Sequence, residues 1–487
     1  MTAPDGAPWD LLVVGGGTAG LLAARTAARF GARVLLVDDA QPGGDCLWTG
    51  CVPSKSLLAA AEVAATARDG ARFGVRVDGV AVDGPAVLRH VLAARAAIAP
   101  HDSAEALRAD GVQVRRGRAR FLAPGLVAVD GPDGVREERY HHAVVATGAD
   151  PAVPPVPGLR DVTPLTTATL WSLTDLPSSV AVVGGGAIGC ELGQALARLG
   201  VAVTLVEQGD RLLAKEDPDA SALVRAALER DGVDVRVGAA VERVDADPDR
   251  AGAGTLLLGD GASVAVDRVL VAVGRRPATA GLGLDAVGVA VDEHGHVVVD
   301  ERLRTTAPRV WAAGDVTGHP QFTHTAGAHG STVAANAVLG LRRRVDSSGE
   351  PRVTFTDPEV AAVGVGTDVA AGRGLRVVTR RHDSVDRAVT QGRTEGWTRL
   401  VVDRRGRVVG AGVVGPRAGE TLGELSLAVA EGVTLRRLAG VTHAYPTWND
   451  GIWTAASDDR FASLGRGVVA RVLRLLVRLR RRAASRG

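Results

Sequence analysis

The chain has 487 residues, of which 46% are apolar and 23% charged, with a formal net charge of +2 and only three cysteines. This length allows about three domains, and the composition excludes a disordered chain or one stapled by disulfides. No window reaches the ~20 consecutive apolar residues of a membrane span, and no basic segment with an apolar run precedes the first strand, so we expect no signal peptide and a cytoplasmic location.

The first element expected in chain order is a strand that runs directly into a glycine-rich turn. Apolar residues Leu11 to Val14 precede a Gly-x-Gly-x-x-Gly pattern formed by Gly15, Gly17 and Gly20. An alanine-rich helical stretch follows, and then a strand, Val34 to Val37, that ends in Asp38. The glycines of such a unit allow a tight turn, close approach of the backbone to a pyrophosphate and close helix packing, while the acid accepts hydrogen bonds from a ribose. These parts together predict a dinucleotide site.

Two cysteines, Cys46 and Cys51, follow this unit in the segment Gly43-Gly44-Asp45-Cys46-Leu47-Trp48-Thr49-Gly50-Cys51-Val52-Pro53-Ser54-Lys55. A close pair in a cysteine-poor chain is typical of a redox or metal-binding site in a reducing compartment. The alternatives are a helix-capping disulfide or two inert buried thiols. Lys55 is one of only two lysines in the chain, so its compact ammonium group is expected to have a specific role.

The same dinucleotide pattern recurs later in the chain. Strand Val180 to Val183 leads into a helix, Cys190 to Leu199, and a strand, Val201 to Val206, with the glycines Gly184, Gly186 and Gly189 at the turn. Glu207 ends this unit, and a carboxylate there bonds the free 2′-hydroxyl of NAD and repels the 2′-phosphate of NADP. NADH is therefore favoured over NADPH, although Arg211 is close enough in sequence to weaken the preference. We expect Cys190 to be buried and inert.

The chain ends in a basic amphipathic segment. Residues 466–487 contain eight arginines and no acid, whereas the preceding part is mildly acidic. Apolar residues recur at helical spacing and arginines form the opposite stripe: Val469, Val472, Leu473, Leu476 and Leu479 against Arg471, Arg474, Arg478 and Arg481. Two interpretations are open, a helix lying on an anionic membrane surface and a helix docked on the protein or on a second copy. Nucleic-acid binding is not expected, because the basic charge is confined to one terminal helix.

Four further motifs accompany the fingerprints and the cysteine segment: Ala146-Thr147-Gly148, Gly274-Arg275-Arg276-Pro277, Ala313-Gly314-Asp315-Val316 and Phe355-Thr356-Asp357-Pro358-Glu359. With these motifs the chain resembles, over roughly residues 10 to 465, the class I pyridine nucleotide-disulfide oxidoreductases, the family of dihydrolipoamide dehydrogenase, glutathione reductase and mercuric reductase.

The resemblance implies an α/β fold with two Rossmann-like dinucleotide-binding domains and an α+β C-terminal dimerisation domain. An FAD-binding domain would comprise residues 1–150 and 276–348, interrupted by an NAD(P)-binding domain of residues 151–275. Residues 349–465 would form the dimerisation domain of a homodimer, and residues 466–487 the basic tail.

The resemblance also implies roles for individual residues. Asp315 would bond the ribityl chain of FAD, and its adenosine half would be held by Gly15, Gly17, Gly20 and Asp38. The other implied cofactor contacts are Gly44, Lys55, Thr147, Gly148 and Gly274, and for the nicotinamide nucleotide Gly184, Gly186, Gly189 and Glu207. Cys51 would contact the flavin and Cys46 would attack the substrate. Lys55 would pair with Glu191 where hydride arrives, and its cation would help to lower the pKa of a nearby thiol.

The chain departs from the family near its C-terminus. Disulfide reductases of the family carry a histidine there as general acid and base for the thiols, followed by a glutamate that orients it. Here Tyr445 occupies the position of the histidine and Asp450 that of the glutamate. A tyrosine has a pKa near ~10 against ~6.5 for histidine, so it is a poor proton shuttle at neutral pH. His443, two residues earlier, is expected to be structural. Asp45 replaces the usual threonine and is expected to disfavour a thiolate at Cys46.

We therefore expect an enzyme that passes hydride from NADH through FAD to a Cys46–Cys51 disulfide and on to a small-molecule electron acceptor of disulfide or dithiol type. The alternatives are a quinone or metal-ion reductase, with the tail in peripheral membrane contact, and a non-catalytic NADH-responsive flavoprotein. Mercury transfer would lack its delivery thiols, because no vicinal cysteine pair closes the chain. No resident metal is expected.

Overall fold

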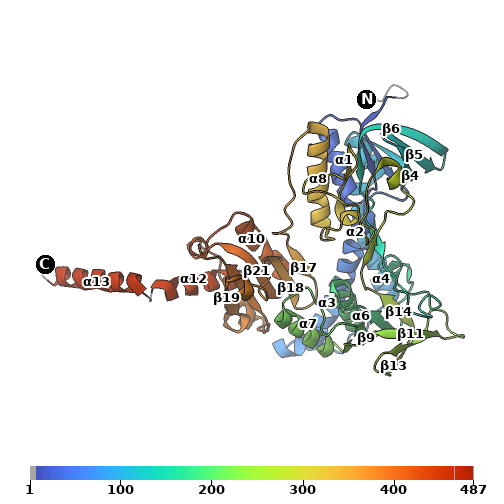
Figure 1. Ribbon diagram of the computed structural model, residues 1–487. Helices are drawn as coiled ribbons and strands as arrows, with labels where there is room; N and C mark the ends of the chain where they lie inside the picture. Colours follow the sequence, from blue (N-terminus) through green and yellow to red (C-terminus); the bar gives the residue numbers. More distant parts are fainter. Residues whose placement is uncertain (1–6, 465–466, 486–487) are drawn as a thin grey trace. The chain divides into compact units, whose positions relative to one another are not determined.

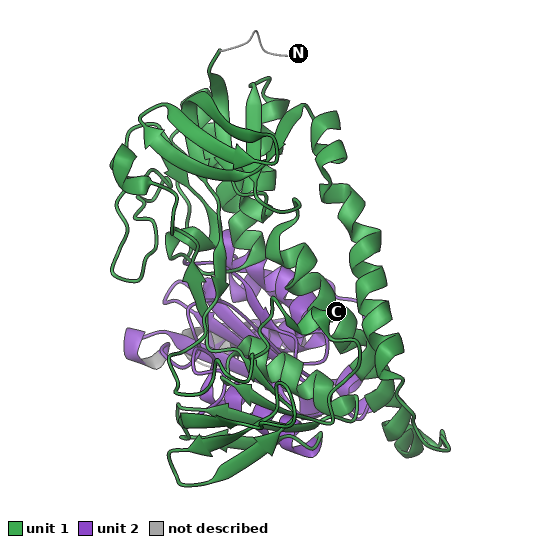
Figure 2. Ribbon diagram, turned by 90° about the vertical axis from the view of Figure 1, so that its right-hand side faces the viewer, with its two compact units in different colours: residues 1–210, 231–347 green, residues 211–230, 348–487 purple. Residues whose placement is uncertain are grey.

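The computed structural model describes residues 7–464 and 467–485, which form two compact units. One unit contains residues 7–210 and 231–347, and the other contains residues 211–230 and those from 348 onward. Figure 1 follows the chain by colour, and Figure 2 draws the two units in green and purple.

The first unit is built on a sheet with the strand order β3-β2-β1-β6-β5-β4, in which β16 also pairs with β6. Strands β3, β2, β1, β6 and β16 pair in parallel, whereas β4 and β5 are antiparallel additions. The strands are β1 Trp9–Val14, β2 Val34–Asp38, β3 Val112–Arg116, β4 Arg118–Ala123, β5 Leu126–Gly131, β6 Gly134–Val145 and β16 Val310–Ala312.

Apolar side chains cover both faces of this parallel sheet. Leu11 and Val13 of β1 point into one buried cluster, and Leu12 and Val14 point into the other. The first cluster includes residues of helices α1 (Thr18–Arg29) and α8 (Thr323–Leu339), which lie side by side (Figure 1). Burial on both faces explains why β1 reads as an uninterrupted apolar run.

A second parallel sheet in this unit has the order β10-β9-β8-β14, and its first crossover is helix α6. A three-stranded antiparallel sheet, β11-β12-β13, shares its core, and β7 pairs with β15 in a short ribbon. The strands are β7 Ala149–Pro151, β8 Ser179–Val183, β9 Ala202–Glu207, β10 Asp234–Val237, β11 Val241–Ala246, β12 Gly254–Leu258, β13 Ser263–Val266, β14 Arg268–Val271 and β15 Arg275–Pro277.

The remaining helices of this unit range from five residues in α2 to 19 in α3. They are α2 Gly44–Trp48, α3 Cys51–Asp69, α4 Gly84–Ile98, α5 Ala104–Ala109 and α6 Ala187–Arg198, with 3₁₀ turns η1 Gly70–Phe73, η2 Ala99–Asp102, η3 Leu170–Ser172, η4 Leu284–Val287 and η5 Gly314–Thr317.

The second unit is an antiparallel sheet of order β17-β18-β21-β20-β19 whose apolar face packs on helices α10, α11 and α12. Its strands are β17 Arg352–Thr354, β18 Glu359–Gly364, β19 Arg376–Arg381, β20 Trp397–Val402 and β21 Val408–Gly415. Its helices are α7 Pro218–Arg230, α9 Asp386–Thr390, α10 Ala418–Ala430, α11 Leu435–Leu438, α12 Asp450–Leu464 and α13 Gly467–Ala484, with 3₁₀ turns η6 Ala371–Arg373 and η7 His382–Ser384.

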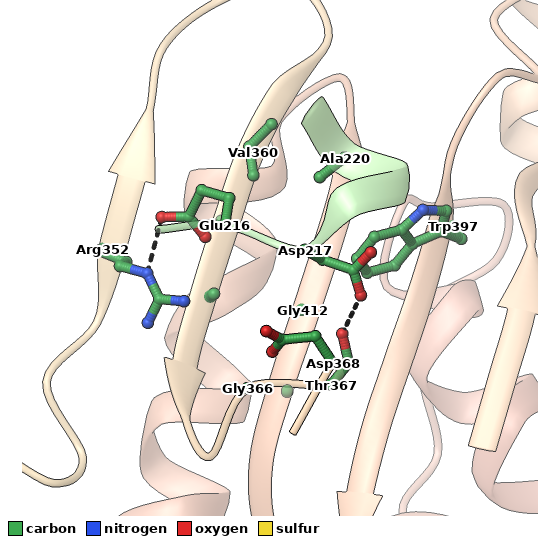
Figure 3. Close-up of a pocket in the computed structure, with 13 residues that line it drawn as sticks. Glu216, Asp217, Ala220, Arg352, Val360, Gly366, Thr367, Asp368, Trp397 and Gly412 are labelled. Carbon is green, nitrogen blue, oxygen red and sulfur yellow. Dashed lines mark hydrogen bonds and ion pairs between the residues drawn. The ribbon is translucent and has the colours of Figure 1, made fainter. Parts of the chain in front are cut away.

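The segment that begins α7 is tied to this sheet by polar contacts around a small cavity (Figure 3). Arg352 donates to Glu216 at 2.7 Å, and Asp217 accepts from Arg399 at 2.7 Å and from Thr367. The cavity of about 10 Å³ has room for about one water molecule. Two of its lining carboxylates, Glu216 and Asp217, pair with arginines, so we interpret the cavity as part of a structural contact and not as a ligand site.

The sheet pairing confirms the predicted fold class. Strands β6 and β16 pair, although the whole second parallel sheet lies between them in the sequence. One Rossmann-like domain is therefore inserted into another, and an α+β domain follows.

Candidate active site

The first glycine fingerprint forms an open turn at the start of α1. Gly15 has φ +105°, and a Cβ there would overlap the carbonyl of Ala146. Helix α1 starts after Gly17 without a side-chain cap, so its first backbone N–H groups are available to an anion. Asp38 accepts hydrogen bonds from Gly16 N and from Ala40 N, and burial raises its pKa.

Gly44 brings the cysteine segment against this turn. The backbone N of Gly43 donates to the carbonyl of Gly16 at 2.8 Å, and a Cβ on Gly44 would come within 2.5 Å of the Cα of Gly17. Gly44 also has φ +59°, so two independent constraints favour glycine there. Helix α2, which carries Cys46, therefore starts directly on the glycine turn Gly15–Gly17.

Two polar groups of the first domain are placed to meet a cofactor. The hydroxyl of Thr147 is buried and accepts or donates no hydrogen bond among the described residues. It is followed by Gly148, with φ +71°. Asp315 lies in η5, where burial raises its pKa even though the Arg275 guanidinium, 3.5 Å away, opposes the shift. An uncapped helix, a glycine cradle and an orphan hydroxyl fit FAD.

The second fingerprint has the same geometry. Gly184 has φ +111°, and a Cβ there would lie 2.6 Å from the carbonyl of Ala272. Helix α6 begins after Gly186 without a side-chain cap, and a Cβ on Gly186 would meet no atom within 4 Å. Glu207 accepts from Gly185 N and Gly209 N, both at 2.6 Å. These residues fit the diphosphate and ribose of a nicotinamide nucleotide.

Three more of the glycines expected to contact a cofactor are constrained by their space or by their backbone angle. A Cβ on Gly20 or Gly189 would overlap the carbonyl of the first glycine of its own fingerprint, and Gly274 has φ +138°. Arg211, expected to weaken the preference for NADH, donates to the carbonyl of Ala214 at 2.8 Å.

Cys51 is the first residue of α3, and Cys46 lies in α2; both are free thiols. The hydrogen bond from Cys46 is the largest effect that lowers the pKa of Cys51, to about 6, against the opposing effect of burial. The hydroxyl of Thr323, 3.4 Å from the Cys51 sulfur, and the charge of Lys55 lower it further. The same bond to Cys51, together with burial, raises the pKa of Cys46. The reduced pair therefore holds one thiolate, on Cys51, and one thiol, on Cys46.

Lys55 lies one helical turn after Cys51 and donates to Glu191 of α6 at 2.8 Å. This is the pair that the resemblance implied. The Glu191 side chain is only 7% exposed and that of Lys55 is 38% exposed, so the pair is more than a solvated surface contact. The neighbouring Cys190 is fully buried, and burial raises its pKa, which fits the expected inert thiol.

The structure corrects the expectation for Asp45. Its carboxylate accepts from the guanidinium of Arg275 and, at 3.2 Å, from the hydroxyl of Thr49. Because Arg275 pairs with this carboxylate and also faces Asp315, the charge of Asp45 is offset and its effect on Cys46 is weakened. Arg275 was quoted as part of a motif but was assigned no role, and no sequence pattern pointed to Thr323.

The second unit gives Tyr445 and Asp450 different hydrogen-bond partners. Tyr445 is 72% exposed, and its hydroxyl donates to Asp386 at 2.6 Å, a contact that raises its pKa. Asp450 is buried in the first turn of α12 and accepts from the backbone N of Thr447 at 3.1 Å. The negative charge of Asp450 adds to the raised pKa of Tyr445, but the tyrosine hydroxyl bonds to Asp386.

His443 has a structural setting, as expected. Its Nε2 lies 2.9 Å from Glu424, its Nδ1 lies 3.1 Å from the carbonyl of Val441, and Asn449 donates to the same Glu424 at 2.9 Å. Both ring nitrogens are thus occupied inside the second unit.

Two features are absent from the part of the chain that the structure describes. No helix there is both long and apolar enough to cross a membrane. No cluster of three or more histidine, cysteine, aspartate or glutamate side chains is arranged there to hold a metal ion.

Comparison with known proteins places these features in one family. Residues 9–330 match the family described as pyridine nucleotide-disulphide oxidoreductase, and residues 350–456 match its dimerisation domain. The chain is 36% identical over 454 residues to a mercuric reductase of Streptomyces lividans, covering 92% of this chain and 95% of the relative. It is 37% identical over 468 residues to a dihydrolipoyl dehydrogenase of Thermus scotoductus, covering 92% and 96%.

Among solved structures, the chain is similar to a Cu(II) complex of the HOCl-induced flavoprotein disulfide reductase RclA from Escherichia coli. The TM-score is 0.82 at 28% sequence identity, and the match covers 93% of this chain and 99% of the other. With its two nucleotide-binding domains, its cysteine pair and its dimerisation domain, the chain belongs to the class I pyridine nucleotide-disulfide oxidoreductases, FAD- and NAD(P)H-dependent flavoenzymes.

Proposed function

We propose that this chain is an NADH-dependent flavoprotein reductase in which Cys46 and Cys51 carry two electrons to a small-molecule disulfide. Bound FAD supplies hydride acceptance from NADH and two-electron delivery to the cysteine pair. The observation that carries the proposal is the unequal state of the two thiols: Cys51 is favoured as the thiolate by Cys46, Thr323 and Lys55. Lys55 and Glu191 hold a fixed charge pair between α3 and α6, beside the start of the cysteine helix.

The exchange with a disulfide acceptor balances with the single proton of the reduced pair. Cys46 passes its proton to the Cys51 thiolate as its sulfur bonds to one acceptor sulfur, and the acceptor S–S bond breaks to release the other acceptor sulfur as a thiolate. The Cys51 sulfur then closes onto Cys46 and displaces the second acceptor sulfur. The enzyme returns to its disulfide, and the proton of the pair leaves with one of the two released thiols, while the other leaves as a thiolate.

Tyr445, in the second unit, limits which disulfides can serve as the electron acceptor. In this family a histidine at the position of Tyr445 acts as acid and base for the thiols. Tyr445 is a weak acid whose pKa is raised further by Asp386, so it cannot shuttle a proton efficiently at neutral pH. Without such an acid, the first acceptor sulfur leaves as a thiolate. This favours acceptors whose thiols are acidic, because leaving-group rates rise as the thiol pKa falls.

The test is a comparison of NADH oxidation with an aryl disulfide, whose thiol is acidic, and with an alkyl disulfide such as cystine. We expect the aryl disulfide to have a kcat/KM about 10²-fold or more higher, within the range of general acid–base effects. The Tyr445→His variant should recover part of the alkyl rate. Equal wild-type rates for both acceptors would contradict this class, and loss of all NADH-driven turnover would contradict the enzyme function itself.

A soft metal ion is a second candidate acceptor. It is supported by the similarity to a mercuric reductase and to a protein crystallised as a Cu(II) complex, and by the affinity of thiolates for soft ions. NADH oxidation that depends on Hg²⁺ or Cu²⁺ and disappears in Cys46→Ser would favour it over a disulfide. The chain has only three cysteines, which leaves no second thiol pair for delivery of the ion.

The finer assignments are proposals too. The boundaries given above for the FAD-binding, NAD(P)-binding and dimerisation domains are supported by the strand pairing and by the two family matches. A homodimer through residues 349–465 is supported by the match to the dimerisation domain. Glu207 supports NADH as the donor. Peripheral membrane contact through residues 466–487, of which 466, 486 and 487 lie outside the described residues, is supported by the composition of that segment.

A further inference from the structure

Helix α13 (Gly467–Ala484) exposes an apolar arc to solvent. Four of its apolar residues, each roughly half exposed, lie within an arc of about 100° on a helix of 3.6 residues per turn: Val472, Leu475, Leu476 and Leu479. Leu473 and Val477, also exposed, widen the arc on one side. Apolar side chains of this size are normally removed from water when they cluster on one helix face.

The charge on α13 is of one sign only. The helix carries six arginines, Arg471, Arg474, Arg478, Arg480, Arg481 and Arg482, and no acid. Five of them lie within a second arc of about 100°, and Arg480 lies beside the apolar arc, on the same side as Leu473 and Val477. Because the helix has no acid, any ion pair of these arginines must come from a group outside the helix.

We propose that α13 binds an anionic phospholipid surface, with the apolar arc inserted at the level of the headgroups and the arginines paired with lipid phosphates. The inference deepens the membrane contact in the proposed function and does not depend on the identity of the electron acceptor. The apolar arc and the arginine arc run together over residues 471–482, about 18 Å of the helix, and this arrangement matches helices that lie in the plane of a membrane. The guanidinium fork suits bidentate contact with phosphate.

Charge complementarity favours lipid over a second copy of the same helix. Two α13 helices packed through their apolar arcs would bring together twelve arginines and no carboxylate, since each contributes six. The mildly acidic body has no attraction of its own for an anionic surface, so the binding should reside in the tail.

The experiment measures sedimentation of the full-length holoenzyme with vesicles of phosphatidylcholine alone or mixed with phosphatidylglycerol, read from bound flavin. One variant removes two charges from the arginine arc, Arg474→Gln with Arg478→Gln. Its matched control removes two exposed charges from the β20–β21 turn of the same unit, Arg404→Gln with Arg405→Gln. A third variant, Leu476→Gln with Leu479→Gln, leaves the charge unchanged.

We expect binding to the anionic vesicles only, weakened by salt. The arginine-arc variant should bind about 30-fold more weakly, at about fivefold for each arginine, and the leucine variant ~10-fold or more weakly. The turn control should match the wild type. Equal losses in the two arginine pairs, binding that survives truncation after Leu464, or no binding of the wild type would overturn the proposal. A change of oligomeric state in the leucine variant without loss of vesicle binding would overturn it in favour of a second copy.

The assay separates this proposal from the redox function. NADH-driven flavin reduction without vesicles should be the same in the wild type and in all three variants, because α13 contributes no residue to the cofactor sites. A protein that reduces its flavin but ignores vesicles refutes only the lipid proposal. A protein that binds vesicles but fails to reduce its flavin refutes only the redox function.

Discussion

Replacing Cys46 by alanine should raise the pKa of the Cys51 thiol from about 6 toward its ordinary value of 9.0, because the hydrogen bond from Cys46 is the largest effect that lowers it. At pH 7 a thiol with a pKa of about 6 is about 90% ionised, whereas one with a pKa near 9 is about 1% ionised, a loss of about 90-fold in thiolate. The Cys51 pKa is lowered because its charged form is stabilised. The thiolate is therefore present above pH 6 in the native pair and only above pH 9 without its donor.

The matched control is Cys46→Ser, which keeps an O–H donor next to Cys51 and should keep much of the lowered pKa. In both variants Cys51 has no disulfide partner, so its ionisation can be read without reductant from the long-wavelength absorption of a thiolate against oxidised flavin. The measurement is the pH midpoint of this band in each variant. Midpoints that agree within a few tenths of a pH unit would refute the reasoning, since the two variants differ in the donor that it invokes.

Three other substitutions test the cofactor sites and the charge pair. Gly44→Ala should lower the FAD content of the purified protein several-fold, because its Cβ would meet the Cα of Gly17 at 2.5 Å. The control Gly74→Ala, at φ +79° but in open space, should lower only the stability. Flavin absorbance per chain measures the FAD content, and equal FAD content in the two variants would contradict the prediction. Glu207→Ala should reduce the ratio of kcat/KM for NADH over NADPH by about 10-fold or more, because a buried charge-assisted contact is worth ~1.5–3 kcal/mol; an unchanged ratio would remove Glu207 as the determinant. Lys55→Met should slow NADH-driven flavin reduction ~10-fold or more at unchanged FAD content, because it removes the cation that pairs with Glu191, which is only 7% exposed. Stopped-flow absorbance measures this rate. The double variant Glu191→Gln with Lys55→Met should recover part of the rate if the charge of Glu191 is the cause.

The fold could be predicted from the sequence because its determinants are local. Each fingerprint combines an apolar strand, a glycine turn and an acid within 28 residues, Leu11 to Asp38 and Val180 to Glu207, and these parts fold as one unit. The insertion of one domain into the other is not local, and it came only from the resemblance. The pairing of β6 with β16 then confirmed it across the whole inserted sheet.

The site was predicted less completely, and the failures share a cause. Thr323 lies 272 residues from Cys51 and belongs to no motif in the sequence, so no sequence pattern predicts its contact with the Cys51 sulfur. The effect expected of Asp45 ignored Arg275, 230 residues away, which pairs with its carboxylate. Tyr445 and Asp450 occupy the family's positions, but the Tyr445 hydroxyl bonds to Asp386, 59 residues away, and Asp450 accepts from the backbone of Thr447. Each of these properties depends on a contact made in the folded chain, and the spacing of residues within a motif does not predict such a contact.

The contact of Gly44 with Gly17 has an evolutionary consequence. A Cβ on Gly44 would meet the Cα of Gly17 at 2.5 Å, whereas a Cβ on Gly17 would lie 3.8 Å from Gly44, so the constraint acts on the cysteine segment. A larger residue at Gly44 would therefore move this segment, and Cys46 with it, away from the glycine turn. Selection that retains the position of the redox thiols acts on Gly44 through this one contact.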